Sequence, residues 1–505
     1  MSEAGTIVER IAAGSDDAPA IGAPERPNLT HAGLKAQMRA TAERLNGLGL
    51  GRNDRIAIIL PNGPEMASAF VSVAACATTA PLNPAYRAEE LDFYLSDIGA
   101  KAILVGEKEQ GPAIAVAKNL GIAVLRLSFD TAQPAGTFAI DGPAVGPAVS
   151  TGAAEDRDIA LLLHTSGTTS RPKLVPLSHA NLAASARNVA AVLALAPPDR
   201  CLNIMPLFHI HGLVAAVTAS LHAGASVFCT PGFNALKFFA WLGEASPTWY
   251  TAVPTMHQAI LARAPRNADA VAAAGLRFIR SSSSSLPTQV MAELEKTFRC
   301  PVIESYGMTE ATHQMTSNPL PPAARKPGSV GSAAGPEVAI MAADGAMLPA
   351  GTQGEIVIRG PNVTAGYEKN PEANASAFAH GWFHTGDQGI MDAQGYVRVT
   401  GRLKEIINRG GEKISPLEVD EVLMDHPAVA QVVTFAMPHD KLGEDVAAAV
   451  VLREGQAASE ADIRSFAATR LADFKVPRKV LILEEIPKGA TGKLQRIGLA
   501  AKLGL

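Results

Sequence analysis

The sequence predicts an α/β protein: a large N-terminal domain of two helix-covered sheets plus a small β-barrel, followed by an α+β C-terminal domain. The chain has 505 residues, which exceeds what one hydrophobic core usually supports, so two or more domains are expected. From about residue 30 to residue 330, short β-branched apolar runs alternate with Ala-rich stretches. This alternation is typical of parallel sheets covered by helices.

Parallel strands are expected at five apolar runs in the first part of the chain, residues 55–60, 102–105, 123–125, 225–228 and 301–303. The apolar stretch 66–82 is rich in Ala, Ser and Thr. It is too short and too weakly apolar to span a bilayer, so we expect a buried core helix there. Residues 136–152 are rich in Pro, Gly and Ala, which predicts a linker or surface loop.

The pattern changes after residue 328. Glycine punctuates the strand-like runs 354–359 and 395–399, which favours a small antiparallel or barrel element. The last segment contains helical patterns over 416–424 and 459–471 and strand patterns over 429–437 and 446–452. We therefore expect an N-terminal domain over 1–400 and a compact C-terminal domain over 401–505.

Composition excludes several classes of protein. The net charge is −4, with 18% charged and 47% hydrophobic residues, which is ordinary for a soluble enzyme and indicates no nucleic-acid or membrane partner. Four widely spaced cysteines are expected to be reduced, buried thiols. The first ten residues lack a secretory signal pattern, and Lys502-Leu503 lies too early for a peroxisomal tripeptide. Cytoplasmic residence is the default expectation.

A Ser/Thr/Gly loop follows the apolar run 161–163 and carries Arg171 and Lys173. Glycine lets the backbone approach an anion, hydroxyl groups donate hydrogen bonds, and the two cations supply charge for a polyphosphate. The loop lacks the Walker spacing. A solvated turn is the alternative that the loop alone leaves open.

Further motifs follow this loop in order, at residues 206–212, 305–310, 381–387, 400–405 and 487–493. Together the motifs resemble the adenylate-forming superfamily of acyl-CoA synthetases, peptide-synthetase adenylation domains and luciferases. The resemblance spans nearly the whole chain. It implies that a carboxylate attacks the α-phosphate of ATP, with Mg²⁺ bound, and that CoA then displaces AMP. It also implies that the C-terminal domain is mobile and rotates between the two steps.

The resemblance assigns roles to individual residues. Thr165, Glu310 and Lys493 would be catalytic, and Glu310 would hold Mg²⁺, because an acidic residue beside phosphates requires a metal between them. Tyr306 would stack on adenine, and Asp387 would accept hydrogen bonds from the ribose. The residues assigned to ATP are Thr165, Ser166, Gly167, Thr168, Thr169, Lys173, Ser283, Ser284, Ser285, Glu304, Ser305, Tyr306, Gly307, Thr309, Asp387, Arg402 and Lys493.

Simpler roles remain open for three of these residues. Glu310 could be a helix-start carboxylate, Tyr306 a core tyrosine and Asp387 a turn residue.

The C-terminal segment is implied to serve both steps. Lys493 would bridge the substrate carboxylate and the α-phosphate, a task that suits a compact, flexible cation. Lys404 occupies the hinge position. Gly410, Gly411 and Glu412 would line the CoA tunnel, where glycine permits close approach of a thin ligand arm. A glycine replaces the lysine of the luciferase pattern in this stretch, which disfavours luciferase chemistry.

The residues expected to line the acyl pocket predict a small polar acid as the substrate. Five consecutive serines occupy residues 281–285, where the family usually has small, partly apolar residues, and buried hydroxyl groups favour a polar ligand. The set of Ser283, His211 and His313, with His209 nearby, resembles the oxalate-CoA ligase branch.

Alternatives remain open for the acyl pocket and for the activity. The serines could face adenine while the histidines are structural. The chain could instead be a ligase for a medium-chain fatty acid or a 4-coumarate-type acid, or a non-catalytic nucleotide-binding homologue. The sequence does not indicate an oligomeric state.

Overall fold

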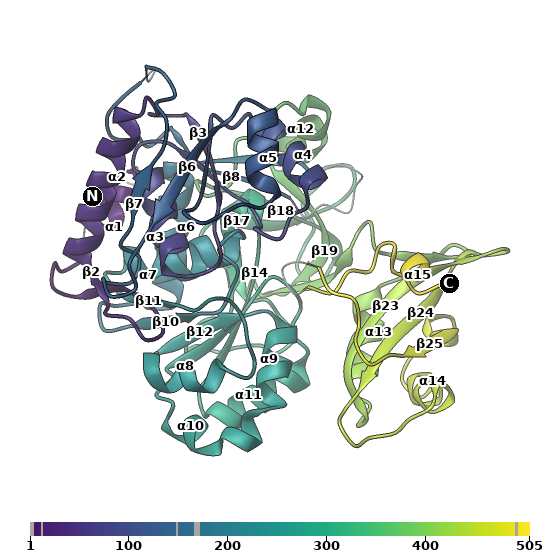
Figure 1. The fold of residues 1–505 in the computed structure, drawn as a ribbon. Helices are drawn as coiled ribbons and strands as arrows, with labels where there is room; N and C mark the ends of the chain where they lie inside the picture. Colours follow the sequence, from purple (N-terminus) through teal and green to yellow (C-terminus); the bar gives the residue numbers. More distant parts are fainter. Residues whose placement is uncertain (1–4, 12–13, 148–149, 166–171, 490–492) are drawn as a thin grey trace.

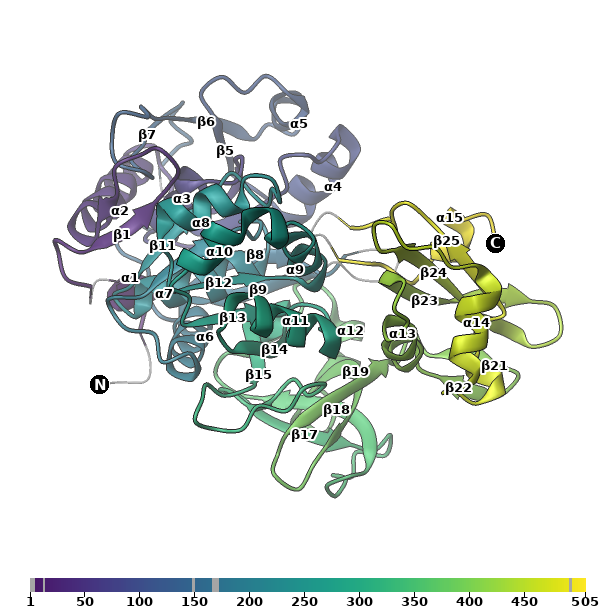
Figure 2. The same cartoon turned by 90° about the horizontal axis from the view of Figure 1, so that it is seen from below.

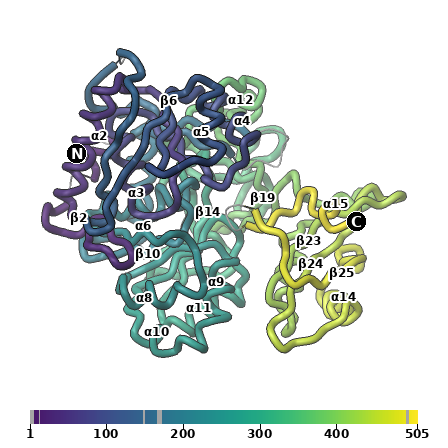
Figure 3. Tube along the Cα trace, viewed as in Figure 1, coloured from purple at the N-terminus to yellow at the C-terminus, as the bar shows by residue number. Residues whose placement is uncertain are grey.

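The computed structural model describes residues 5–11, 14–147, 150–165, 172–489 and 493–505. Figures 1 and 3 show a large N-terminal body and a smaller C-terminal part that lies beside it, joined near residue 400. In the described part of the chain, no helix is both long and apolar enough to cross a membrane.

Seven strands form the first sheet: β3 (Arg55–Ile59), β4 (Thr78–Pro81), β5 (Ala102–Gly106), β6 (Ala123–Ser128), β7 (Ala139–Asp141), β8 (Ile159–His164) and β9 (Leu174–Ser178). Their order is β7-β6-β5-β3-β4-β8-β9. The edge strands β7 and β9 run antiparallel to their neighbours, and the inner strands are parallel. Strands β3 and β5 are almost wholly buried, which explains their continuous apolar sequences.

Nine strands form the second sheet: β1 (Pro19–Gly22), β2 (Leu29–Thr30), β10 (Arg200–Asn203), β11 (Ser226–Cys229), β12 (Trp249–Ala252), β13 (Phe278–Ser281), β14 (Val302–Met308), β15 (His313–Ser317) and β16 (Ser332–Ala333). Their order is β16-β15-β14-β13-β12-β10-β11-β1-β2. The six strands from β14 to β1 in this order are parallel. The parallel arrangement expected from the sequence is therefore confirmed for both sheets.

Helices cover both faces of each sheet. One hydrophobic core joins the two sheets through α1 (Ile7–Ile11), α2 (His31–Gly47), α3 (Pro64–Ala74), α6 (His179–Val192), α7 (Ala219–His222) and the π-helix His211–Thr218. The other face of the seven-stranded sheet packs on α4 (Ala88–Ile98) and α5 (Pro112–Asn119). The other face of the nine-stranded sheet packs on α8 (Phe238–Ala245), α9 (Pro254–Leu261) and α11 (Thr288–Phe298). Two short helices, α10 (Ala268–Ala273) and α12 (Pro371–Ala377), complete this part.

A separate antiparallel sheet contains β17 (Glu337–Met341), β18 (Gln353–Arg359), β19 (Phe383–Met391) and β20 (Val397–Arg402) in sequential order. The sequence predicted an antiparallel or barrel element here. The described strands form an open sheet, so the small β-barrel of that prediction is corrected to its antiparallel alternative. Four buried residues, Val330, Ile340, Ile356 and Val397, supply its core.

The C-terminal part has the expected α+β composition. Strands β21 (Ile407–Arg409), β22 (Glu412–Ile414), β23 (Val429–His439), β24 (Gly443–Leu452) and β25 (Lys479–Ile482) form one sheet. Helices α13 (Pro416–Met424) and α14 (Glu460–Ala468) pack on one face of it. Helix α15 (Leu499–Lys502) packs against the other core of this part.

Two local expectations were wrong. The helix expected over 66–82 ends at Ala74, and Thr78–Pro81 forms the buried strand β4. The β-branched pair Thr78-Thr79 suits a strand, and the neighbouring parallel strands supply its hydrogen bonds. The loop expected over 136–152 contributes the edge strand β7. The four cysteines are free and buried, as expected.

Candidate active site

The residues predicted to bind the acid and the nucleotide gather at one edge of the nine-stranded sheet. Strands β10, β12, β13 and β14 are parallel neighbours, so their carboxyl ends lie at the same edge. Figure 2 shows β12, β13, β14 and β15 as a stack of adjacent strands. His209 and His211 follow β10, the serine run begins at the end of β13, and Tyr306 and Gly307 lie in the outer half of β14.

Asp387 and Arg402 form a cross-strand pair beside Tyr306. The two residues are register partners in the β19–β20 ladder. Arg402 Nε donates to Asp387 Oδ1 over 2.8 Å, and the Tyr306 hydroxyl donates to Oδ2 over 2.5 Å. Each carboxylate oxygen can accept more than one hydrogen bond. Two protein donors therefore fix the carboxylate and leave it able to accept from ribose hydroxyls, although the nucleotide contact stays a prediction.

Glu310 lies in a short 3₁₀ helix, Thr309–Ala311, that follows β14. Its side chain is buried, and its Oε1 accepts a hydrogen bond from the Tyr367 hydroxyl over 2.8 Å. The Lys173 ammonium lies 4.3 Å from the centre of the Tyr367 ring. Burial raises the pKa of Glu310, and the nearby cations Arg402 and Lys173 oppose that rise.

The two ends of the predicted phosphate loop are held together. Thr165 N–H donates to the Lys173 carbonyl over 2.9 Å, and Lys173 N–H donates to Thr165 Oγ1 over 3.2 Å. These contacts continue the β8–β9 ladder. Burial lowers the pKa of the Lys173 ammonium, and Lys404 lowers it further by charge repulsion. The predicted residues Ser166, Gly167, Thr168 and Thr169, together with Arg171, lie outside the described residues.

The serine run is anchored by Glu304 and Ser305. Ser282 Oγ donates to the Ser305 carbonyl over 3.0 Å, and Glu304 Oε1 accepts from the Leu286 N–H over 2.9 Å. Burial raises the pKa of Glu304 to about 8. The two residues predicted at the ATP site thus engage their side chains with the serine loop. Of the predicted serines, Ser283 is half-buried, whereas Ser284 and Ser285 are exposed.

His211 lies at the start of the π-helix His211–Thr218 and is fully buried. Its Nδ1 lies 3.0 Å from Ser283 Oγ, and its Nε2 lies 2.6 Å from Thr251 Oγ1 and 3.3 Å from an Arg280 nitrogen. An arginine can only donate, so Nε2 accepts and Nδ1 carries the proton. Ser283 Oγ therefore accepts from His211, and its own hydroxyl hydrogen is free to donate. Ser283 holds this place with a φ of 74°.

His313 lies next to His211 and lacks hydrogen-bond partners in the described structure. Its side chain is 1% exposed, and both ring nitrogens are buried and unpaired. The two imidazole rings are 4.9 Å apart. Burial is the main cause that holds the pKa of each imidazole well below its ordinary value, and Arg280 adds charge repulsion. Both rings are therefore neutral near pH 7, and each carries one N–H donor.

Lys493 links the two halves of the site. Its charge interacts with Arg402 and Asp387 on one side and with His209, His211 and His313 on the other. Burial lowers the pKa of the Lys493 ammonium to about 8. The loop of Lys493 is anchored by Arg496, which forms ion pairs with Glu405 at 3.4 Å and Asp420 at 2.6 Å. The C-terminal part therefore presents this lysine to the edge of the nine-stranded sheet.

The predicted CoA residues do not join this cluster. Gly410 and Gly411 form the exposed turn of the β21–β22 hairpin, with φ values of 60° and 102°, and Glu412 is also exposed. The hinge residue Lys404 lies in the exposed turn between β20 and β21. In this orientation of the C-terminal part, the structure brings Lys493 to the site and leaves the hairpin outside it.

Sequence reasoning missed three residues of the site, Thr251, Arg280 and Tyr367. Thr251 and Arg280 lie in β12 and β13, where their polar side chains interrupt otherwise apolar strands. An arginine within the apolar strand pattern directly before the serine run was a usable signal, because a core strand rarely contains an arginine that has no partner. Tyr367 gave no comparable signal, since its role depends on packing between distant segments.

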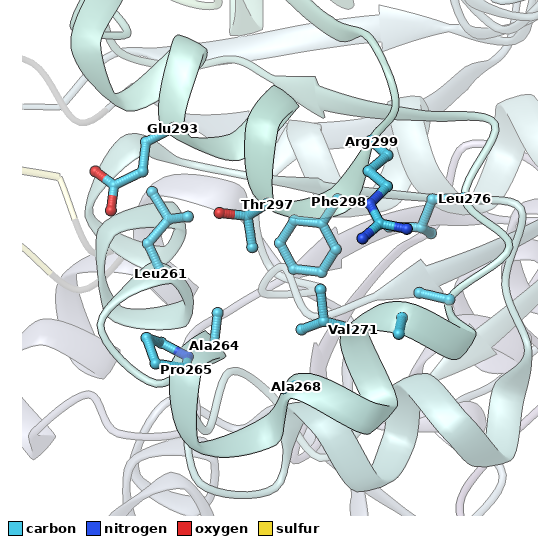
Figure 4. A pocket seen from close by; sticks show the side chains of 12 residues that line it. Leu261, Ala264, Pro265, Ala268, Val271, Leu276, Glu293, Thr297, Phe298 and Arg299 are labelled. Atoms are coloured by element: carbon cyan, nitrogen blue, oxygen red, sulfur yellow. The ribbon is translucent and has the colours of Figure 1, made fainter.

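A surface pocket of about 450 Å³ lies elsewhere, between α9, α10 and α11. Figure 4 shows its largely apolar lining, with Glu293, Thr297 and Arg299 as polar members. None of the described site residues lines it. The described residues also contain no cluster of three His, Cys, Asp or Glu side chains that could hold a metal alone. A single carboxylate such as Glu310 fits Mg²⁺ together with phosphate oxygens and water.

Comparison with known families gives two matches. The family of AMP-binding enzymes matches residues 8–368. The AMP-binding enzyme C-terminal domain matches residues 418–493. The two matches together span most of the chain.

The chain is also similar to proteins of known activity. It is 45% identical to an oxalate–CoA ligase of Arabidopsis thaliana, covering 97% of this chain and 96% of the relative. It is 40% identical to an oxalate–CoA ligase of Saccharomyces cerevisiae, covering 88% of this chain and 86% of the relative.

MatB from Rhodopseudomonas palustris is a solved structural relative, 30% identical over 99% of both chains. Its ATP-bound form superimposes with a TM-score of 0.87, and its apo form with 0.78.

Proposed function

The chain belongs to the AMP-binding enzyme family, and on that premise we propose that it is an AMP-forming acid–CoA ligase whose substrate is oxalate. The products would be oxalyl-CoA, AMP and pyrophosphate. The two relatives named as oxalate–CoA ligases match nearly the whole chain and support this activity.

The unpaired His313 imidazole is the observation that carries the choice of acid. A buried polar group without a partner costs about 1–3 kcal/mol, so a ligand that supplies the missing hydrogen bond gains affinity. His313 lies beside His211, near Ser283 and Lys493, and its two ring nitrogens are unpaired. A second carboxylate would accept from the neutral imidazole N–H and from the free Ser283 hydroxyl. A fatty or aromatic chain would leave these donors buried and unpaired.

The ribose, the magnesium ion and the phosphates of ATP would each be bound by residues whose geometry fits that group. Asp387, fixed by Tyr306 and Arg402, would accept hydrogen bonds from the ribose. Glu310 would hold Mg²⁺ against the phosphates, where the metal would neutralise negative charge. Lys173 and the loop that begins at Thr165 would bind the β- and γ-phosphates.

The first half-reaction joins one oxalate oxygen to the α-phosphorus of ATP. The bond between the α-phosphorus and the bridging oxygen breaks, and pyrophosphate leaves with the electron pair. Lys493 would stabilise the negative charge shared by the attacking carboxylate and the α-phosphate, because its ammonium interacts with both the ribose pair and the histidine cluster. The better superposition on the ATP-bound relative supports this orientation for the first step.

The second half-reaction requires a different face of the C-terminal part. We take residues 401–505 as a lid domain that turns about Lys404, withdraws Lys493 and brings the Gly410–Gly411 hairpin to the site. The CoA sulfur would then attack the acyl carbon, and AMP would leave with the bonding electrons. The exposed glycine turn offers a path for a thin pantetheine arm.

A substrate panel tests the proposal. Purified protein is assayed for pyrophosphate release with ATP, Mg²⁺, CoA and one acid at a time, and the acyl-CoA product is identified by mass. Oxalate should give the highest kcat/KM. A higher value for hexanoate or 4-coumarate would contradict oxalate as the substrate while leaving the ligase activity intact. Absence of ATP–pyrophosphate exchange with every acid would instead indicate a non-catalytic nucleotide-binding protein.

A further inference from the structure

Arg280 is a fully buried cation without a carboxylate partner. Its side chain is 0% exposed on β13. One terminal nitrogen lies 3.3 Å from His211 Nε2, and the other lies 3.3 Å from the Gln314 side-chain oxygen. Its Nε is buried and has no acceptor in the described structure. Both partners are neutral, so the protein leaves the charge of this side chain unbalanced.

The neighbouring arginine shows the usual arrangement. Arg277 directly precedes β13, and its guanidinium forms an ion pair with Asp199 at 2.9 Å. Burying an unpaired guanidinium carries a large free-energy penalty, and a chain retains such a group when the charge has a use. Burial lowers the pKa of Arg280 to about 9, so the group is still a cation near pH 7. The missing anion must therefore come from outside the described protein.

The contacts of Arg280 lead directly to the acyl pocket. Its N–H donates to His211 Nε2, which fixes the proton of His211 on Nδ1. The Nδ1–H then donates to Ser283 Oγ over 3.0 Å, so that the Ser283 hydroxyl hydrogen points to another acceptor. The charge of Arg280 also acts on His313, whose ring nitrogens are unpaired.

We propose that Arg280 is a positioning residue for the distal carboxylate of a dicarboxylate substrate. Its positive charge, next to His211, balances the negative charge of the distal carboxylate. It also holds His211 in the tautomer that leaves the Ser283 hydroxyl hydrogen free to donate. The inference rests on the proposed function, since it explains how the same pocket selects an acid with two carboxylates. The contact with substrate is made by Ser283 and His313, and Arg280 acts through them.

The first experiment compares Arg280→Met with wild type and with the control Arg277→Met. The KM for oxalate should rise by up to about 10-fold to 150-fold in Arg280→Met, the range expected if the charge-assisted hydrogen bond that Arg280 prepares at Ser283 is lost. The KM for ATP should stay within about threefold. Arg277→Met should leave both KM values near those of wild type, because its ion pair lies outside the site. An unchanged oxalate KM in Arg280→Met would overturn the inference.

A second variant keeps the test decisive if Arg280→Met fails to fold. Arg280→Lys retains a cation, but a buried lysine loses its proton far more readily than an arginine. The titratable groups that face this position are Cys201, His211, His257 and His313, with Lys493 beyond the histidines. The ratio of oxalate KM in Arg280→Lys to that in wild type should rise between about pH 5 and pH 8, because a buried lysine loses its proton in this range whereas Arg280, with a pKa of about 9, keeps its own. A constant ratio would contradict the inference.

Different results would contradict the proposed function and the role of Arg280. If wild-type protein does not activate oxalate, the proposed function is wrong. If wild-type protein activates oxalate and both Arg280 variants keep its KM, only the role of Arg280 is wrong. Melting temperatures of each variant, with and without ATP, identify any loss that arises from unfolding.

Discussion

At the scale of single residues, the site depends on which groups are charged. His211 and His313 are buried and neutral, so they act as N–H donors rather than as cations. The positive charge of the acyl pocket comes instead from Arg280 and Lys493, which flank the histidines. This division would let the pocket bind an anion through neutral N–H and O–H donors, with the cations beside them.

Removing either donor should weaken binding of the acid alone. His313→Ala and Ser283→Ala are each expected to raise the KM for oxalate about 10-fold to 150-fold, because each deletes one charge-assisted hydrogen bond. The KM for ATP should change little. Steady-state kinetics with each substrate varied in turn measures both values. Equal increases for oxalate and ATP would indicate a general structural defect and would refute the assignment.

Lys493 should give the first half-reaction a distinct pH dependence. The ammonium is a cation below its pKa of about 8 and neutral above it. Since adenylation needs the cation, kcat/KM for ATP should fall about tenfold per pH unit above that value. ATP–pyrophosphate exchange measures this profile. In Lys493→Arg the guanidinium stays protonated, so its residual exchange should lack the fall.

Lys493→Ala separates the two half-reactions. It should abolish exchange and leave the attack of CoA on a supplied acyl-adenylate largely intact. Equal loss in both half-reactions would rule out the proposed role.

At the scale of elements, the site is built by the turn between β14 and β15. The two strands pair antiparallel, with Gly307 opposite Gln314 and Met308 opposite His313. A Cβ on Gly307 would lie 1.6 Å from the His313 carbonyl oxygen. Tyr306, Glu310 and His313 lie within this short segment, so the predicted adenine, metal and acid contacts would all depend on the same turn.

Gly307→Ala should therefore damage stability and acid binding together. The added methyl group must displace β15, which is expected to cost about 1–3 kcal/mol. Thermal unfolding and the KM for oxalate measure the two effects. Gly106→Ala is the matched control, because a Cβ at the end of β5 meets no atom within 4 Å. A Gly307→Ala protein with wild-type stability and KM would show that β15 can move freely.

The sequence predicted the elements better than the contacts between them. Strands β3, β5, β18 and helix α13 begin or end within a residue or two of the predicted bounds, because their apolar patterns are local. Strand β4 was missed because pairing with β3 and β8 determines it. The tautomer of His211 depends on Arg280, 69 positions away. Such long-range contacts leave no periodic signal in the chain.

At the scale of the whole molecule, the C-terminal part completes the site from one side. Its core is continuous with the hydrophobic cluster on the outer face of the nine-stranded sheet. Polar contacts also cross this boundary, among them a hydrogen bond from the Gln258 side-chain amide to the Ala430 carbonyl over 2.9 Å and an ion pair between Arg266 and Glu454 at 3.6 Å. The large body carries the residues predicted to contact the acid and the ribose, and the smaller part carries Lys493.

The proposed rotation of this part can be tested at the hinge. In the described backbone, the Lys404 N–H donates no backbone hydrogen bond, whereas the Leu403 N–H donates to the Gly386 carbonyl and the Glu405 N–H donates to the Arg402 carbonyl. Lys404→Pro should therefore be tolerated and should stiffen the turn. Adenylation is expected within a few-fold of wild type, with thioester formation reduced roughly tenfold or more. Lys404→Ala, which keeps the turn flexible, should retain both activities, and a Lys404→Pro protein with full thioester formation would argue against this hinge.

The repulsion between Lys173 and Lys404 would give the proposed catalytic cycle an electrostatic order. Burial is the main cause of the depressed pKa of the Lys173 ammonium, and repulsion by Lys404 lowers that pKa further. The phosphates of bound ATP would neutralise this repulsion and hold the hinge against the body. When pyrophosphate departs, its negative charge would depart with it, and the repulsion would return at Lys404, the proposed hinge residue. The leaving group of the first step would thereby release the motion that admits the second substrate.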